Sequence, residues 1–107
     1  MNQKRIDQIE RKMAKIQEAM GRIGPMRPGS LTCQYRNPRE HTGAYWQISY
    51  TRRMKSHTEY VRPEWVPDIR KQIVTYKRLI SLIEQWIDLS IECSKLRMRI
   101  AKQAGSK

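Results

Sequence analysis

The feature that most constrains this chain is a run of apolar residues at helical spacing between residues 67 and 102. A helix of that length extends roughly 53 Å, which exceeds the width of a small domain. Apolar residues recur within it at intervals of three and four, the heptad pattern of helices that pack along a shared seam. This seam consists of Leu79, Leu82, Trp86, Leu89, Cys93, Leu96 and Ile100.

A second apolar stripe lies beside the seam on the same helix. Together the two stripes cover about half of the helix circumference or more, well above the ~100° apolar face of an ordinary surface helix. One N-terminal helix cannot cover both stripes, so we expect the long helix to pack on that helix and also on a partner chain. The sequence therefore predicts a homodimer or small homo-oligomer with the seam as its interface. The second stripe consists of Ile69, Ile73, Tyr76, Ile80, Ile83 and Ile87.

Charge gives the second constraint. The 107 residues include 22 Lys and Arg against 10 Asp and Glu, which gives a formal net charge of +12. A body this basic attracts polyanions, nucleic acid first and an acidic protein or a membrane surface second. A merely soluble basic protein is the plain alternative, because the excess of charge is spread along the whole chain.

Length and composition predict a single domain, 1–107, whose core is thin because only 38% of the residues are hydrophobic. Apolar spacing, prolines and glycines divide this domain into segments. The fold class is α+β: an N-terminal helix, a three-stranded antiparallel β-meander, and a long C-terminal helix that forms a helical bundle or coiled-coil oligomer. The predicted segments are a helix over 1–23, a linker over 24–30, a β-meander over 31–62, a long helix over 63–102 and a basic tail over 103–107.

The middle of the chain alternates with period two over residues 44–51, which indicates a half-buried strand. A second strand follows over 55–61, and 31–36 is a weaker third one. A tight turn at 53–54 would set the register so that one face packs on the helices and the other is polar. The register pairs Tyr50 with His57, Ile48 with Glu59 and Trp46 with Val61.

The polar face is the candidate working surface, with basic residues of the hairpin tip and the loops beside it. A β-ribbon fits the major groove of DNA, where Gln, Ser and Thr reach base edges and Arg binds guanine or phosphate. Exposed tyrosines could instead stack on unpaired bases. A solvated face without a ligand is the third alternative, since Thr, Ser and Tyr suit strands. The candidate nucleic-acid-binding residues are Arg36, Arg39, Tyr45, Gln47, Arg52, Arg53, Lys55, Tyr60 and Arg62.

A series of short motifs resembles a known family. The chain has MRPGSL at 26–31, SYT at 49–51, TEYVRPE at 58–64 and LSIE at 89–92. In this order they resemble a widespread family of small bacterial proteins described only as a domain of unknown function. The resemblance extends over about residues 6–98. It implies the same succession of N-terminal helix, linker and long C-terminal helix, and it implies no activity.

The chain departs from that family in two places. Many relatives have several cysteines between the first two strands, where residues 36–43 contain none, so a metal-binding knuckle cannot be carried over to this chain. Relatives also tend to have Gly in the second hairpin turn, near Met54. Because a non-glycine residue adopts positive φ only at a cost, we expect a looser four-residue loop there instead of a two-residue turn.

The sequence gives no indication of catalysis. His41 and His57 belong to no arrangement of nucleophile, base and orienting group, and Cys33 and Cys93 stand far apart without a metal-ligand spacing. We therefore expect no enzyme activity, no metal and no cofactor. The chain has no apolar run long enough to cross a membrane, and its N-terminus lacks the apolar region of a secretory signal, so we expect a cytoplasmic protein.

Two functional classes remain from the sequence. The first is a non-catalytic, basic, homodimeric nucleic-acid-binding protein, an accessory of a mobile element or phage, which contacts DNA rather than RNA through the polar sheet face and the basic hairpin. The alternative is a protein-interaction or adaptor module that docks an acidic or coiled-coil partner. The basic hairpin beside the tyrosine-bearing face favours the first, while the apolar surface of the long helix suits either.

Overall fold

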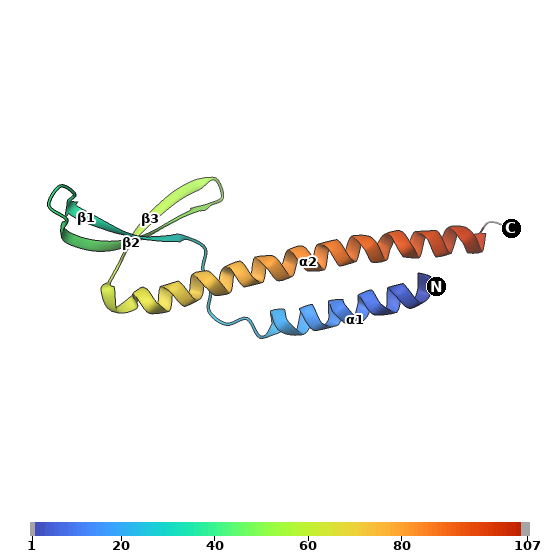
Figure 1. Cartoon of the computed structure of the whole chain (residues 1–107). Coiled ribbons are helices and arrows are strands. Elements are labelled where there is room, and N and C mark those ends of the chain that lie inside the picture. Colours follow the sequence, from blue (N-terminus) through green and yellow to red (C-terminus); the bar gives the residue numbers. More distant parts are fainter. Residues whose placement is uncertain (1, 106–107) are drawn as a thin grey trace. The chain divides into compact units, whose positions relative to one another are not determined.

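The computed structural model describes residues 2–105. Its elements confirm the predicted α+β class, with an N-terminal helix, a three-stranded antiparallel sheet and a long C-terminal helix (Figure 1). The last helix begins after a short 3₁₀ turn and continues to Gly105, so the predicted basic tail is helical as far as that residue. The elements are α1 (Asn2–Gly21), β1 (Ser30–Asn37), β2 (Thr42–Arg52), β3 (Lys55–Val61), η1 (Pro63–Trp65) and α2 (Val66–Gly105).

The chain forms two compact units. The helix-pair unit contains residues 1–23 and 78–107, and the sheet unit contains residues 24–77. Helix α2 contributes to both, with its first part in the sheet unit and its second part in the helix-pair unit. The single domain predicted from length and composition stays a prediction.

In the helix-pair unit, α1 lies along the second part of α2 and runs in the opposite direction (Figure 1). The apolar residues of α1 recur at helical spacing, so they form one stripe that faces α2. Ile6 and Ile9 make a buried core with Cys93 and Leu96, the two most buried residues of the predicted seam. Met13, Leu89 and Ile100 pack around this core.

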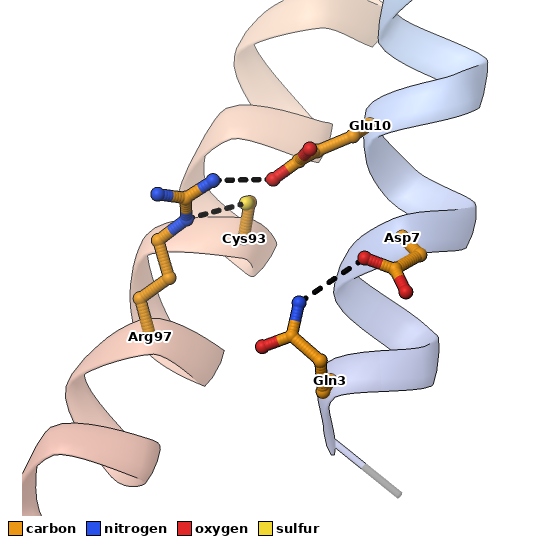
Figure 2. A network of polar contacts seen from close by, with 5 residues as sticks. All are labelled: Gln3, Asp7, Glu10, Cys93 and Arg97. Atoms are coloured by element: carbon orange, nitrogen blue, oxygen red, sulfur yellow. Dashed lines mark hydrogen bonds and ion pairs between the residues drawn. The ribbon is translucent and has the colours of Figure 1, made fainter.

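Polar contacts run beside this apolar contact. Arg97 bonds to the carboxylate of Glu10 on α1 and donates from Nε to Sγ of Cys93 at 3.4 Å (Figure 2). A second pair joins Arg5 and Glu92, whose charged atoms lie 2.8 Å apart. Since all four charged side chains are about half exposed, solvent screens both pairs and they add little to stability. The buried apolar residues therefore dominate the stability of the helix pair.

The sheet has the order β1-β2-β3, and its register confirms the predicted hairpin: Tyr50 lies opposite His57. Ile48 is fully buried and forms the core of this unit with Val61, Val66 and Ile73. The first part of α2 therefore covers one face of the sheet. The other predicted pairs are also present, Ile48 with Glu59 and Trp46 with Val61.

The β2–β3 turn corrects one prediction. Arg52 pairs directly with Lys55, so the turn contains only two residues and not the looser four-residue loop expected. Arg53 and Met54 both have positive φ, at 52° and 65°. This geometry matches the right-handed twist of the strands, which outweighs the cost of holding two non-glycine residues in the left-handed region.

The linker between α1 and β1 packs against the sheet and the first part of α2. The amide of Arg27 donates to the backbone oxygen of Gln72 on α2, at 3.3 Å. Gly29 has φ of +144°, and a Cβ at this position would lie 2.6 Å from Cγ1 of Ile48. A glycine is therefore required where the linker crosses the buried core residue of the sheet.

Candidate nucleic-acid interface

The polar face of the sheet exists as predicted and is wider than expected. Gln47 lies in the middle strand, opposite Thr32 on one side and Tyr60 on the other. The hydroxyls of Ser49 and Thr58 lie 3.3 Å apart. Because side chains alternate along each strand, this face contains Thr32, Gln34, Arg36, Tyr45, Gln47, Ser49, Thr51, Ser56, Thr58 and Tyr60.

Strand β1 adds two residues that the candidate site did not include. Thr32 and Gln34 belong to the polar face, and Nε2 of Gln34 donates to Oγ1 of Thr32 at 3.4 Å. The predicted strand over 31–36 already places Thr32 and Gln34 on one side, because they are two residues apart. Only the pairing of β1 with β2, in which Thr32 lies opposite Gln47, shows that this side is the polar face.

The structure brings together the three uncharged residues of the predicted site. Tyr60 is paired with Gln47, and Tyr45 lies two residues before Gln47 on the same face. The side chain of Tyr60 is 64% exposed, so its ring is accessible for stacking. Gln47 is half-buried among its strand neighbours, which restricts the orientation of its amide.

The predicted basic residues fall into two groups. Arg36 lies two residues after Gln34 in β1 and therefore on the polar face. Arg62 follows Tyr60 by two residues in extended backbone, and Arg39 lies in the β1–β2 loop. Arg52 lies two residues after Tyr50 and pairs with Lys55, so both lie on the face of Tyr50, opposite the polar face. The tip is therefore not one continuous surface with the polar face, and Arg53 lies in the turn between the two groups.

A cluster of polar side chains lies on the face of Tyr50. The Tyr50 hydroxyl donates to Oε1 of Glu59 at 2.7 Å, and Nη2 of Arg27 lies 3.5 Å from Oε2 of the same carboxylate. The guanidinium of Arg27 also lies over the Tyr50 ring, 5.2 Å from its centroid. His57 stacks on Tyr50 with ring centroids 5.0 Å apart.

This cluster perturbs two pKa values. The bond from Tyr50 lowers the pKa of Glu59, and the charge of Arg27 lowers it further. The same bond to the Glu59 carboxylate raises the pKa of Tyr50. Arg27 had no place in the predicted site, because no local pattern connects a linker residue with a strand residue so far along the chain.

The predicted oligomer seam has a partner within the chain. Its residues Cys93 and Leu96 are buried against α1, and Leu89 and Ile100 pack beside them. Three isoleucines of the second stripe, together with Ile91 one turn further along, are instead 36–49% exposed on α2. We call these residues the isoleucine stripe: Ile80, Ile83, Ile87 and Ile91.

Within residues 2–105, no three His, Cys, Asp or Glu side chains come together as a metal site would require. Cys33 is exposed and Cys93 is buried, both as free thiols. Over the same range, the helices contain no stretch that is long and apolar enough to cross a membrane.

These features define a small basic α+β protein with a polar sheet face and a helix pair. The chain belongs to the family described as "Domain of unknown function (DUF6788)", which it matches over residues 3–71. The matched region contains α1, the whole sheet and only the beginning of α2. Among curated proteins and among solved structures, no significant match is found.

Proposed function

We propose that the chain is a non-catalytic, homodimeric nucleic-acid-binding protein that contacts DNA with the polar face of its sheet. The observation that carries the proposal is the row formed by Thr32, Gln47 and Tyr60 at the centre of that face, in a chain of net charge +12. An amide between hydroxyl-bearing neighbours matches the donor and acceptor edges that bases present in the major groove. The net charge supplies the attraction to phosphates that any such contact needs.

Binding to nucleic acid is tested by fluorescence anisotropy with random duplex DNA, single-stranded DNA and RNA over a salt series. Replacing Arg36 and Arg62 together by alanine should reduce the slope of log affinity against log salt by about two, since each phosphate contact contributes ~0.9. The control replaces Lys12 and Lys15 on α1, which removes the same charge from exposed positions of the helix-pair unit. The polar face is not the interface if both double variants lower the slope equally.

Base reading and stacking give different results in the same titrations. If Gln47 reads a base edge, Gln47→Ala should cost about 1–3 kcal/mol on a preferred duplex and little on random DNA. If Tyr60 stacks on unpaired bases, Tyr60→Ala should cost about 1–3 kcal/mol on single strands of any sequence. We favour duplex DNA, because a ribbon with an amide at its centre suits a groove. Neutral results for both variants on every substrate would reject the site.

The isoleucine stripe supports the homodimer. Its exposed residues recur at intervals of three and four along α2, the spacing of a helix that packs on another helix. The seam is already covered in part by α1, so a second copy is better placed on the stripe. Light scattering should then give at least twice the chain mass of 12.8 kDa.

Three charged variants on α2 separate the two apolar surfaces. Ile87→Glu should give a folded protein of single-chain mass, because the 44% exposed side chain contributes little to the helix pair. Leu89→Glu should instead unfold the helix pair, since its charge would face the apolar core. Ser81→Glu, at an exposed position, should leave the dimer intact. A wild-type monomer at high micromolar concentration would contradict the dimer.

The exposed isoleucines also favour a second candidate, a protein-interaction module that docks an acidic or coiled-coil partner. This alternative predicts no binding to any nucleic acid at 50 mM salt, where phosphate contacts are strongest. The family motifs suit both candidates, because they support the fold. We propose that relatives with segments like MRPGSL and TEYVRPE share the ion pair between Arg27 and Glu59, which joins these two motifs here.

A further inference from the structure

A cavity of about 570 Å³ opens beside the Arg27 and Tyr50 cluster, within the sheet unit. Its volume is in the range of small-molecule sites. Three elements contribute to it: the linker supplies Arg27, strand β2 supplies Tyr50 and Arg52, and the first part of α2 supplies Tyr76. Met26 and Pro28 complete its apolar wall. This cavity lies on the face of Tyr50 and so does not use the polar face of the sheet.

Arg27, which lines this cavity, has an unsatisfied donor. Its Nε is buried and has no hydrogen-bond acceptor, although Nη2 of the same guanidinium pairs with Glu59. A buried unpaired donor is unfavourable, because it has lost its hydrogen bond to water without gaining another. An oxyanion in the cavity that accepts from the parallel Nε–H and Nη2–H groups, in exchange for the contact with Glu59, would satisfy this donor.

The charges at the cavity favour an anion. Arg52 adds a second guanidinium, and Lys55 lies opposite it in the sheet, while Glu59 offsets one of the positive charges. Two arginines suit a phosphate better than a single carboxylate, since phosphate offers three acceptor oxygens and more charge. The phenol ring of Tyr76 and the apolar Met26 and Pro28 provide a surface for a flat ring next to the phosphate.

We propose that this cavity binds a nucleoside monophosphate group, either as a free nucleotide or as the 5′ end of a strand. The phosphate contacts Arg27 and Arg52, and the base lies against Tyr76 and Pro28. This site does not depend on duplex binding by the polar face.

The test observes the Arg27 donor directly. In ¹H–¹⁵N spectra tuned to arginine side chains, Arg27→Lys identifies the Arg27 Nε–H signal by removing it. Adenosine 5′-monophosphate should shift this signal downfield at a concentration at least tenfold lower than adenosine or inorganic phosphate needs. Single-stranded DNA with and without a 5′-phosphate then separates a strand end from a free nucleotide, because only a strand-end site prefers the phosphorylated oligonucleotide over the free nucleotide.

Variants assign the two halves of the ligand. Arg52→Gln, at an exposed position, should weaken binding of the nucleotide at least tenfold without affecting the fold. Tyr76→Leu should weaken binding of the nucleotide and leave binding of inorganic phosphate unchanged. Arg36→Gln is the matched control, because it removes an arginine from the polar face and should change nothing here.

Three results would overturn the proposal: an Arg27 Nε–H signal that does not move at millimolar nucleotide, equal binding by Arg52→Gln and the wild type, or equal affinity for adenosine and its monophosphate. Duplex titrations with the Arg36 and Arg62 double variant report on the polar face alone. A negative result for nucleotide binding in the cavity can therefore be told apart from a negative result for DNA binding by the polar face.

Discussion

The helix-pair unit and the sheet unit bury their apolar residues to different extents. In the sheet unit, the first part of α2 covers the apolar face around Ile48 and the remaining sheet face is polar. In the helix-pair unit, α1 covers the seam around Cys93 and Leu96, while the isoleucine stripe is left 36–49% exposed. The core of the sheet unit is thus covered within one chain, although Trp65 and Val74 are exposed, while the helix pair leaves a whole row of isoleucines partly exposed. We expect self-association from the helix pair and ligand recognition from the sheet.

The largest expected effects come from the two fully buried isoleucines, one in each unit. Ile9→Ala and Ile48→Ala should each cost about 3–4 kcal/mol through lost burial and the cavity left behind. If the units open independently, Ile9→Ala should raise hydrogen exchange only in α1 and the second part of α2, and Ile48→Ala only in residues 24–77. The exposed Val74→Ala is the control. Raised exchange throughout the chain in both variants would establish one cooperative domain.

The linker glycine gives the next largest effect and acts in the sheet unit. Gly29→Ala should cost about 2–3 kcal/mol, because its Cβ would overlap Ile48 and its backbone would be strained. Gly24→Ala is a matched control in the same linker, where an added Cβ meets nothing within 4 Å. Urea denaturation followed by tryptophan fluorescence measures both. Equal stability of the two variants would show that the linker can leave the sheet at little cost.

The sheet unit also shows how much of the fold can be predicted from the sequence. Period two and one assumed turn were enough to predict the partners of Trp46, Ile48 and Tyr50, because a slip of one residue would expose the whole apolar set. The cluster of Arg27 and Glu59 could not be predicted in this way. Their contact depends on the path of an irregular linker, and Arg27, unlike Glu59, belongs to no periodic pattern.

The helix-pair unit was predictable in a different respect. Heptad spacing identified the seam that contains Cys93 and Leu96, yet it could not tell whether α1 or a second chain covers it. The β2–β3 turn was mispredicted for a related reason. The local cost of positive φ at Met54 argued for a longer loop, but the strand pairing on both sides fixes a two-residue turn.

The strain in that turn should be measurable. Met54 is 98% exposed with φ of 65°, so it contributes almost no packing and is held in the left-handed region. Met54→Gly should therefore stabilise the protein by about 0.5–1 kcal/mol, which is the relief of strain minus the greater unfolded-state entropy of glycine. Met54→Ala keeps the strain and should be neutral. Urea midpoints give both values, and a destabilised Met54→Gly would mean that the turn is not strained.

The smallest expected effect is a pH dependence that comes from the sheet unit alone. The pKa of Glu59 is lowered from 4.5 by the hydrogen bond from Tyr50 and by the charge of Arg27. A depressed carboxyl pKa contributes stability that is fully present above the unfolded value and is lost as the pH falls through the folded value. The wild type should therefore exceed Glu59→Gln in urea midpoint at pH 6, and this difference should shrink steadily below about pH 4.5. Tyr50→Phe removes the donor that lowers the pKa most, so its difference from the wild type should shrink over the same interval. A difference that is constant from pH 6 to pH 3 would show that the carboxylate does not stabilise the hairpin through these contacts.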